Sequence, residues 1–280
     1  MTPVVAGAKG QRTLGNILDT IIADKREEVA QRRAATSLDE LKAQVADRPR
    51  CRNFYKAVTK RHRRGINVIA EVKKASPSAG LIRSDFDPVA IAQIYERCGA
   101  DAISVLTDEK YFQGRLEYLD QIKQAVSLPV LRKDFIIDIW QVYEARAAGA
   151  DAILLIGDVL KPGDVMDLMI AATELTLTVL LEVHHADTLL GFRSLIGFPE
   201  ARYSVLGINN RDLTTMQVDI NTTGRLKGML DDDVPVVAES GIKTRDDVEK
   251  LISVGARAVL IGQTLCEHPD IEQKFAELFG

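Results

Sequence analysis

The sequence GADAILLI, residues 149–156, places a glycine, an alanine and an acidic residue directly before a short apolar run. The same arrangement occurs as GADA at 99–102, and GARA at 255–258 repeats it with an arginine in place of the acidic residue. A glycine in this place ends a helix in the left-handed conformation, and the alanine lets the chain turn closely into the next strand. The motif therefore indicates repeated connections from a helix to a strand.

Outward from these positions, eight short apolar runs alternate with longer amphipathic segments. The runs are Asn67 to Lys73, Asp101 to Thr107, Pro129 to Lys133, Ala152 to Ile156, Thr178 to Val183, Val205 to Asn209, Val234 to Ala238 and Ala258 to Ile261. Their starts are about 20 to 35 residues apart, which is the length that one strand, one loop and one helix use. This alternation predicts an α/β fold of eight β/α units.

The eight units favour a closed (β/α)8 TIM barrel over an open doubly wound sheet. The chain has 280 residues, 46% of them hydrophobic and 27% charged, which is ordinary for a globular protein and enough for one barrel. An open sheet would be expected to carry G-x-G-x-x-G after an early strand, and the sequence has no such pattern. We therefore predict a single-domain protein with a catalytic barrel over residues 65–280.

Residues 1–64 predict a helical extension packed on the barrel. Apolar residues recur at helical spacing from Leu14 to Ile22, and a charged stretch from Lys25 to Arg33 follows. Ser37 and Glu40 have the spacing of a capping box, which predicts a second short helix ending near Ala46. The apolar face of the first helix must cover part of the barrel.

The charge is distributed unevenly along the chain. Residues 1–64 carry 15 Lys and Arg against 7 Asp and Glu, and the rest carry 21 against 33, so the net charges are +8 and −12. A nucleic-acid-binding arm is one interpretation. The other, which we favour because the basic residues alternate with an apolar helical face and lack interleaved aromatic residues, is that the extension docks on its own acidic barrel. We expect no nucleic-acid partner.

No segment predicts a membrane or secreted protein. Met1 to Arg12 lacks the apolar run of a signal peptide, and apolar stretches such as Ala152 to Ile156 are too short to span a bilayer. Three widely separated cysteines fit neither a disulfide framework nor a C-x-x-C pair. We expect a cytoplasmic protein with inert thiols.

Polar side chains gather where the apolar runs end, which in a barrel is the rim that holds the active site. In chain order they are Glu71 and Lys73, Lys133 and Asp134, Glu182 and His184, Asn209 and Arg211, Glu239 and Ser240 with Gly241, and Gly262 with Gln263. A charge inside a barrel is costly to bury unless it is paired, so a sequence selected for stability alone would place apolar residues there. Any single residue could belong to a rim ion pair, but the whole set indicates catalysis.

The last two strands predict a phosphate site. Ser240-Gly241 and Gly262-Gln263 offer backbone N–H groups after the seventh and eighth runs, where many barrels bind a phosphate. Ser76 and Ser78 could donate hydroxyls to the same ligand or merely shape a loop. His184 and His185 lack the spacing of a metal site, so we expect no metal.

Longer motifs resemble the indole-3-glycerol-phosphate synthase family. They are IAEVKKASPS at 69–78, LTDEKYFQG at 106–114, LRKDFI at 131–136, GINNRDL at 207–213 and AESGI at 238–242. The motifs follow the family's order over most of the chain, and the family also has extra helices before its first strand.

This resemblance implies an enzyme of tryptophan biosynthesis that needs no cofactor or metal. The expected reaction is ring closure, decarboxylation and dehydration of 1-(2-carboxyphenylamino)-1-deoxyribulose 5-phosphate, which makes the enzyme a carboxy-lyase. By family position Lys133 is the leading general acid and Glu182 the leading base or charge stabiliser. Lys73 is a second proton donor or carboxylate anchor, and Glu71 orients the two lysines.

The remaining family positions imply contacts with a phosphorylated small-molecule substrate. Asn209, counted with the catalytic set, and Arg211 position the substrate, and Glu239 also contacts it. An apolar wall is formed by Phe112, Leu154 and Leu260. The phosphate is contacted at or near Ser76, Ser240, Gly241, Gly262 and Gln263. The family more often has Glu or Ser at the last of these positions, so a backbone N–H rather than the Gln263 side chain is expected to do this work.

Three alternatives remain open at this point. Phosphoribosylanthranilate isomerase is a related barrel, but it would use a cysteine base and no cysteine here ends a strand. A Schiff-base aldolase would use Lys133 or Lys73 as the nucleophile. A non-catalytic sugar-phosphate-binding protein is the third. The sequence does not fix the oligomeric state, although a monomer is slightly favoured.

Overall fold

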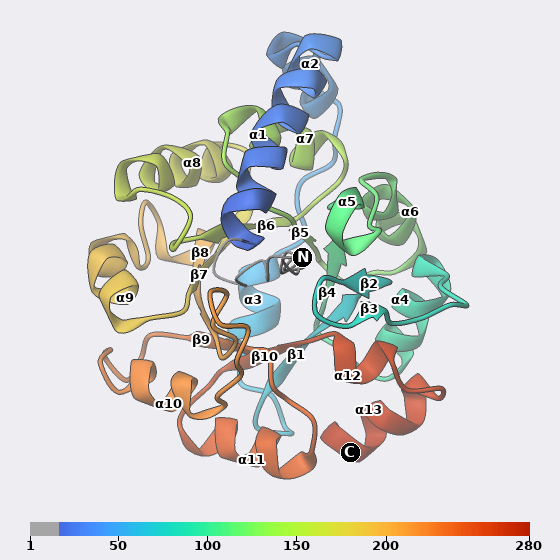
Figure 1. Ribbon diagram of the computed structural model, residues 1–280, viewed down its shortest axis with the longest axis vertical. Helices are drawn as coiled ribbons and strands as arrows, with labels where there is room; N and C mark the ends of the chain where they lie inside the picture. The colour runs from blue at the N-terminus through green and yellow to red at the C-terminus, as the bar shows by residue number, and fades with distance from the viewer. Residues whose placement is uncertain (1–16) are drawn as a thin grey trace, which may run out of the picture.

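The computed structural model describes residues 17–280 and contains a closed barrel of parallel strands (Figure 1). The barrel strands are β1 (Asn67–Val72), β4 (Ala102–Leu106), β5 (Val130–Lys133), β6 (Ala152–Ile156), β7 (Thr178–Val183), β8 (Ser204–Asn209), β9 (Val236–Glu239) and β10 (Ala258–Ile261). Each strand pairs with the next of these in sequence, and β10 pairs with β1. The eight predicted runs match these strands within two residues at each end, so the (β/α)8 barrel is confirmed.

Helices surround the barrel (Figure 1). The outer helices are α4 (Pro88–Arg97), α6 (Glu117–Ala125), α7 (Ile139–Ala147), α8 (Pro162–Glu174), α9 (Ala186–Phe192), α10 (Asn221–Lys227), α11 (Arg245–Ser253) and α13 (Ile271–Phe279). The connections contain the short elements β2 (Ala75–Ser76), β3 (Gly80–Leu81), α5 (Glu109–Phe112), η2 (Arg193–Leu195), η3 (Ala201–Tyr203) and α12 (Gln263–Cys266). Gly99, Gly149 and Gly255 have φ values of 86°, 92° and 85°, as the repeated motif predicted.

The extension contains α1 (Ile17–Ala35) and α2 (Leu38–Ala46), close to the predicted limits. Both bonds of the Ser37–Glu40 capping box are present, which confirms the predicted start of α2. Leu14 and residues 1–12, on which part of the sequence interpretation rests, lie outside the described residues.

Basic side chains of the extension bind acidic side chains of the barrel. Arg48 Nη1 lies 2.8 Å from Asp120 Oδ1, and Arg32 Nη2 lies 2.7 Å from Glu144 Oε1. These contacts place basic side chains of α1 and of the segment after α2 against acidic side chains of α6 and α7.

A third helix, α3 (Phe54–Thr59), was not predicted, because six residues are too few to carry a clear helical period. It lies at the amino-terminal end of the barrel, where Asn67, the first residue of β1, donates its side-chain amide to the carbonyls of Val58 (3.0 Å) and Lys60 (2.8 Å). Phe54 and Val58 are fully buried and join the apolar layer inside the barrel. This helix closes the barrel end opposite the predicted site.

The structure also bears on the cysteines and on the length of the apolar helices. Cys51, Cys98 and Cys266 are free thiols. Within residues 17–280, no helix combines the length and apolar character that crossing a membrane would require.

Phe54 provides a test of the role of α3. Phe54→Ala would leave a cavity at the closed end of the barrel, and we expect it to lower the free energy of unfolding by about 3 to 5 kcal/mol. Denaturation by urea measures this change. Lys56→Ala, on the exposed side of the same helix, is the control and should change stability by less than about 0.5 kcal/mol. Equal effects of the two variants would contradict the role assigned to α3.

Candidate active site

The site is built two residues beyond an apolar layer inside the barrel. Ile69, Leu131, Leu180 and Val237 belong to this layer and are fully buried. Because alternate residues of a strand point to the same side, the next inward-facing positions are Glu71, Lys133, Glu182 and Glu239. The strand period thus carries all four ionisable groups to the carboxyl-terminal end of the barrel.

All fifteen site residues predicted from the sequence line one cavity of about 560 Å³. They are Glu71, Lys73, Ser76, Phe112, Leu154, Lys133, Glu182, Asn209, Arg211, Glu239, Ser240, Gly241, Leu260, Gly262 and Gln263. The structure brings together residues from all eight barrel strands or the loops that follow them. Their individual roles remain predictions.

Lys133 lies at the centre of the charged part of the cavity. Its Nζ is 3.1 Å from Glu182 Oε2 and 3.2 Å from Glu239 Oε2. Beside it, the Lys73 ammonium contacts the Glu71 carboxylate. Two ammonium groups and three carboxyl groups therefore share one space, in which the carboxyl groups are almost completely buried.

The surroundings change the proton affinity of these groups. Burial would lower the pKa of the Lys133 ammonium, but attraction by Glu182, Glu239 and Glu71 raises it. Burial and then repulsion by Glu182 raise the pKa of Glu239 to about 8, against the attraction of Lys133. Near neutral pH, Lys133 is therefore charged and Glu239 holds a proton.

Glu182 is the ionised member of the two neighbouring carboxyls. Burial would raise its pKa, but Lys133 and then His184 lower it well below the usual range. His184 Nε2 lies 3.2 Å from Glu182 Oε1, and its Nδ1 lies 2.6 Å from Asp158 Oδ2. Burial would lower the pKa of His184, but these two carboxylates raise it to about 10.

His184 is among the rim residues expected from the sequence, but the sequence assigns it no role, and it does not point to Asp158 at all. His184 was placed at the end of a strand and rejected only as a metal ligand, although its two-residue separation from Glu182 could have indicated a contact. Asp158 follows β6, and nothing in its local sequence points to His184. Across the part of the chain that is described, no group of three or more His, Cys, Asp or Glu side chains is arranged to hold a metal ion.

Two glycines make room for the carboxylates. A Cβ atom on Gly207 would overlap Glu239 Oε1, and a Cβ atom on Gly262 would overlap the Glu71 side chain. Any larger residue at these positions would have to displace a carboxyl group. The need to leave space for Glu71 thus explains the glycine at position 262 independently of phosphate binding.

The predicted phosphate residues line the same cavity. Ser240 and Gly241 both have positive φ values, 65° and 80°, and a non-glycine residue in this conformation is strained. The Ser240 carbonyl accepts a hydrogen bond of 3.1 Å from Asn210 Nδ2. The Gln263 side chain instead donates to Glu267 Oε2 at 3.2 Å. The backbone after β9 is therefore held in the left-handed conformation at Ser240 and Gly241. The Gln263 side chain is bound to Glu267.

The extension contributes residues that the sequence analysis did not include in the site. Ile17, Leu18 and Ile21 of α1 line the cavity together with Leu213 and Met216 of the loop after β8. The helical apolar face indicated that α1 covers something, but its target could not be located from the sequence alone.

These features define a class of protein: a (β/α)8-barrel enzyme with a lysine–carboxylate site at the carboxyl ends of its strands. Residues 18–278 match the family model for "Indole-3-glycerol phosphate synthase". Curated relatives of that name include those of Geobacillus kaustophilus (47% identity, 94% of this chain and 97% of that protein) and Desulfotalea psychrophila (47%, 95% and 99%). The chain belongs to the indole-3-glycerol phosphate synthase family, and its activity is the synthesis of indole-3-glycerol phosphate.

A solved structure with the same fold is that of 3-hexulose-6-phosphate synthase. It matches with a TM-score of 0.59 and covers 76% of this chain and 98% of its own. At 15% sequence identity this similarity concerns the fold alone. The family and the carboxy-lyase activity expected from the motifs are confirmed by the family match and the curated relatives.

His184 gives a prediction for the dependence of stability on pH. Its pKa is about 10 in the folded protein and ordinarily 6.5, so its contribution is complete below about pH 6.5 and is lost as the pH rises toward 10. We expect the free energy of unfolding to contain a term that falls by about 1 kcal/mol per pH unit in this window.

Urea denaturation between pH 7 and 9 measures this term. The term should disappear in His184→Gln, whereas the control His185→Gln, which changes the exposed neighbour, should keep it. Identical pH dependence in His184→Gln and the parent protein would show that His184 is not held as a cation.

Proposed function

We propose that the cavity catalyses ring closure, decarboxylation and dehydration of 1-(2-carboxyphenylamino)-1-deoxyribulose 5-phosphate, with Lys133 as the general acid. Ring closure requires a proton at the ketone oxygen of the substrate. The observation that carries this assignment is the position of Lys133 Nζ between Glu182 and Glu239, which keeps the ammonium protonated inside the cavity.

Glu182 acts as the base or charge stabiliser. Its lowered pKa keeps the carboxylate ionised, so it can accept a proton or stabilise positive charge during ring closure and water loss. Lys73 acts as a second proton donor or binds the substrate carboxylate, and Glu71 holds its ammonium. Glu239 contacts the substrate beside Lys133.

The remaining lining residues bind and orient the substrate. Phe112, Leu154 and Leu260 form an apolar wall for the aromatic ring. Asn209 and Arg211 position the sugar chain; Asn209 Oδ1 accepts a hydrogen bond of 3.0 Å from the Arg211 backbone N–H. The phosphate is bound at Ser76, Ser240, Gly241, Gly262 and Gln263, where backbone N–H groups rather than the Gln263 side chain do the work.

The other activities considered from the sequence are less well supported. A Schiff-base aldolase needs a neutral lysine amine, whereas the carboxylates around Lys133 keep it protonated. An isomerase of the cysteine–aspartate type needs a cysteine at the cavity, and none of the described residues that line it is a cysteine. No specific observation favours a non-catalytic binding protein.

We further propose that the protein is a cytoplasmic monomer without a nucleic-acid partner. The pairing of Arg32 and Arg48 with acidic residues of the barrel supports the absence of a nucleic-acid partner, because these charges are used within the chain. We retain residues 1–64 as the extension and residues 65–280 as the catalytic barrel of one domain.

The acid and base assignments are tested by turnover of the carboxyphenylamino-deoxyribulose phosphate, followed by indole fluorescence. Lys133→Met should lose activity, and Glu182→Gln should fall by roughly 10²- to 10⁴-fold, because each removes a proton-transfer or charge-stabilising group. Lys250→Met changes an exposed residue far along α11 and should behave like the parent. Normal turnover by Lys133→Met would remove the acid assignment but not the family activity.

The phosphate assignment is tested by comparing Gly262→Ala with Gln263→Ala. The first adds a methyl group that collides with Glu71 and narrows the proposed phosphate site, so kcat/KM should fall by roughly tenfold or more. The second removes only a side chain that bonds to Glu267, and KM should stay within about twofold. A loss of kcat/KM of roughly tenfold or more in Gln263→Ala would show that its side chain binds the phosphate and would contradict the backbone assignment.

A further inference from the structure

Lys25 of the extension is an ammonium group buried outside the reactive centre. Only 1% of its side chain is exposed, although it lies in a charged stretch of α1. Its Nζ is 3.0 Å from Asp108 Oδ2, 3.0 Å from Asp134 Oδ1 and 2.7 Å from Glu28 Oε2. Burial of such a charge is unfavourable unless its partners are fixed, so these contacts constrain where α1 can lie.

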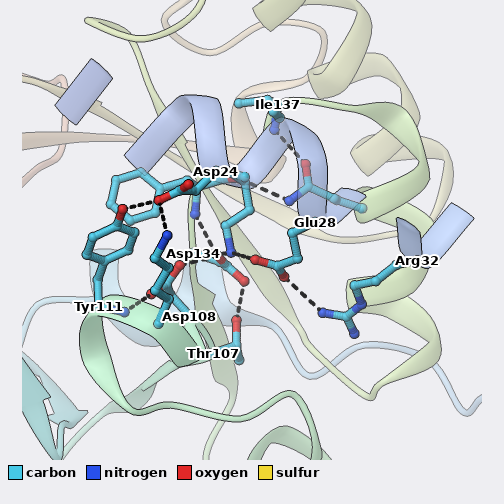
Figure 2. Close-up of polar contacts among 12 residues, drawn as sticks. Asp24, Glu28, Arg32, Thr107, Asp108, Tyr111, Asp134 and Ile137 are labelled. Atoms are coloured by element: carbon cyan, nitrogen blue, oxygen red, sulfur yellow. Dashed lines mark hydrogen bonds and ion pairs between the residues drawn. The ribbon is translucent and has the colours of Figure 1, made fainter. Parts of the chain in front are cut away.

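The contacts of Lys25 continue into a closed ring of six alternating charges. In order around the ring the members are Lys25, Asp134, Arg132, Glu144, Arg32 and Glu28, and the ring returns from Glu28 to Lys25. The successive N–O distances from Lys25 are 3.0, 2.9, 2.8, 2.7, 3.3 and 2.7 Å. Part of this network, with Asp134 reaching toward α1, is drawn in Figure 2. We call it the α1 ring.

The α1 ring joins two parts of the cavity that the fold alone does not connect. On one side, Ile17, Leu18 and Ile21 of the same helix cover the cavity. On the other side, Asp134 directly follows Lys133, and its carboxylate accepts further bonds from Thr107 Oγ1 (2.6 Å) and the Phe135 N–H (2.8 Å). A displacement of α1 would therefore also disturb the strand end that carries Lys133.

The loop after β4 is fixed by the same helix. Asp108, which binds Lys25, begins α5 by accepting a hydrogen bond of 2.8 Å from the Tyr111 N–H. Asp24 of α1 accepts a hydrogen bond from Lys110, and Figure 2 shows the second one that it accepts, from the Tyr111 hydroxyl. Phe112, at the end of α5, lines the cavity. Asp24 and Lys25, adjacent residues of α1, thus contact both the loop after β4 and the loop after β5.

If the α1 ring served only to attach α1 to the barrel, buried ion pairs would not be needed. Well-packed apolar residues replace buried ion networks at no loss of stability in many proteins. Arg33, one residue after Arg32, shows the simpler alternative: its exposed guanidinium binds Asp138 Oδ2 at 2.7 Å and ties α1 to the barrel without touching the ring.

We propose that Lys25 is a positioning residue for catalysis. Through Asp134 and Asp108 it holds α1 across the cavity and fixes the strand end that presents Lys133, and it does not contact the substrate itself. The part that concerns Lys133 rests on the proposed acid role of that lysine. The part that concerns α1 requires only that the substrate bind beneath this helix.

The main test compares a charge-balanced double variant with the parent. Lys25→Met alone leaves Asp108 and Asp134 without their shared cation, so it could fail to fold. Lys25→Met/Asp108→Asn removes one charge of each sign, and the new asparagine can still cap α5. Asp108→Asn alone and Arg33→Met are the controls, because both retain Lys25 in the ring.

The fluorescence of Trp140 reports the position of α1 independently of catalysis. The one tryptophan of the chain, Trp140, is buried against Val29 of α1 and Leu41 of α2, and its Nε1 donates a hydrogen bond of 2.9 Å to Thr36 O between these helices. Its emission and its quenching by acrylamide, measured without substrate because the product also fluoresces, report whether the extension stays docked.

We expect the double variant to unfold cooperatively, with Trp140 emission shifted to longer wavelength and more easily quenched. Its KM for the carboxyphenylamino-deoxyribulose phosphate should rise and its kcat should fall, with kcat/KM reduced by about 10- to 100-fold. Arg33→Met should stay within about twofold of the parent in every measurement.

The proposal is wrong if the double variant has the parent's kcat, KM and Trp140 emission, because Lys25 would then only neutralise buried carboxylates. If neither Lys25 variant folds, Arg32→Met, which opens the ring at its more exposed edge, replaces them, and parent-like kinetics again refute the proposal. Failure of the acid assignment appears separately, as normal turnover by Lys133→Met, and leaves the comparison of KM and Trp140 emission intact.

Discussion

The attraction between the Lys133 ammonium and the Glu182 carboxylate beside it determines what the rest of the barrel must provide. At a separation of about 3 Å and an effective dielectric constant of about 20, opposite unit charges attract by roughly 5 kcal/mol. Removing a single ion from water costs several kcal/mol, so neither partner could be buried here alone. The charges must arrive together, from separate strands, at one height in the barrel. The apolar layer below them and the α3 helix beneath it set that height.

Most of the catalytic cavity could be predicted from the sequence because strand periodicity is local information. Glu71, Lys133, Glu182 and Glu239 each end an apolar run, and the barrel topology brings the ends of all runs to one rim. The motifs around these residues then specified the family. The same logic placed Ser240 and Gly262 at the cavity, although it could not reveal that Gly262 also makes room for Glu71.

The parts that the sequence could not predict depend on partners that are distant in the chain. Lys25 lies among other charged residues of an amphipathic helix and has the pattern of a solvent-exposed position, yet its partners Asp108 and Asp134 bury it. His184 and Asp158 likewise become a pair only when β6 and β7 lie side by side. The α3 helix is too short for periodicity to identify. Side-chain contacts of this kind follow from the tertiary structure, not from spacing.

Gly207 shows how the space inside the barrel limits which substitutions its strands can accept. It pairs with Glu182 on one neighbouring strand and leaves space for Glu239 on the other. A narrow barrel has a fixed interior volume, so each acidic side chain that is added must be matched by an absent one on an adjacent strand. A new reaction on this scaffold would therefore require paired substitutions on neighbouring strands. One strand would gain an acidic residue, and the adjacent strand would gain a glycine that leaves space for it.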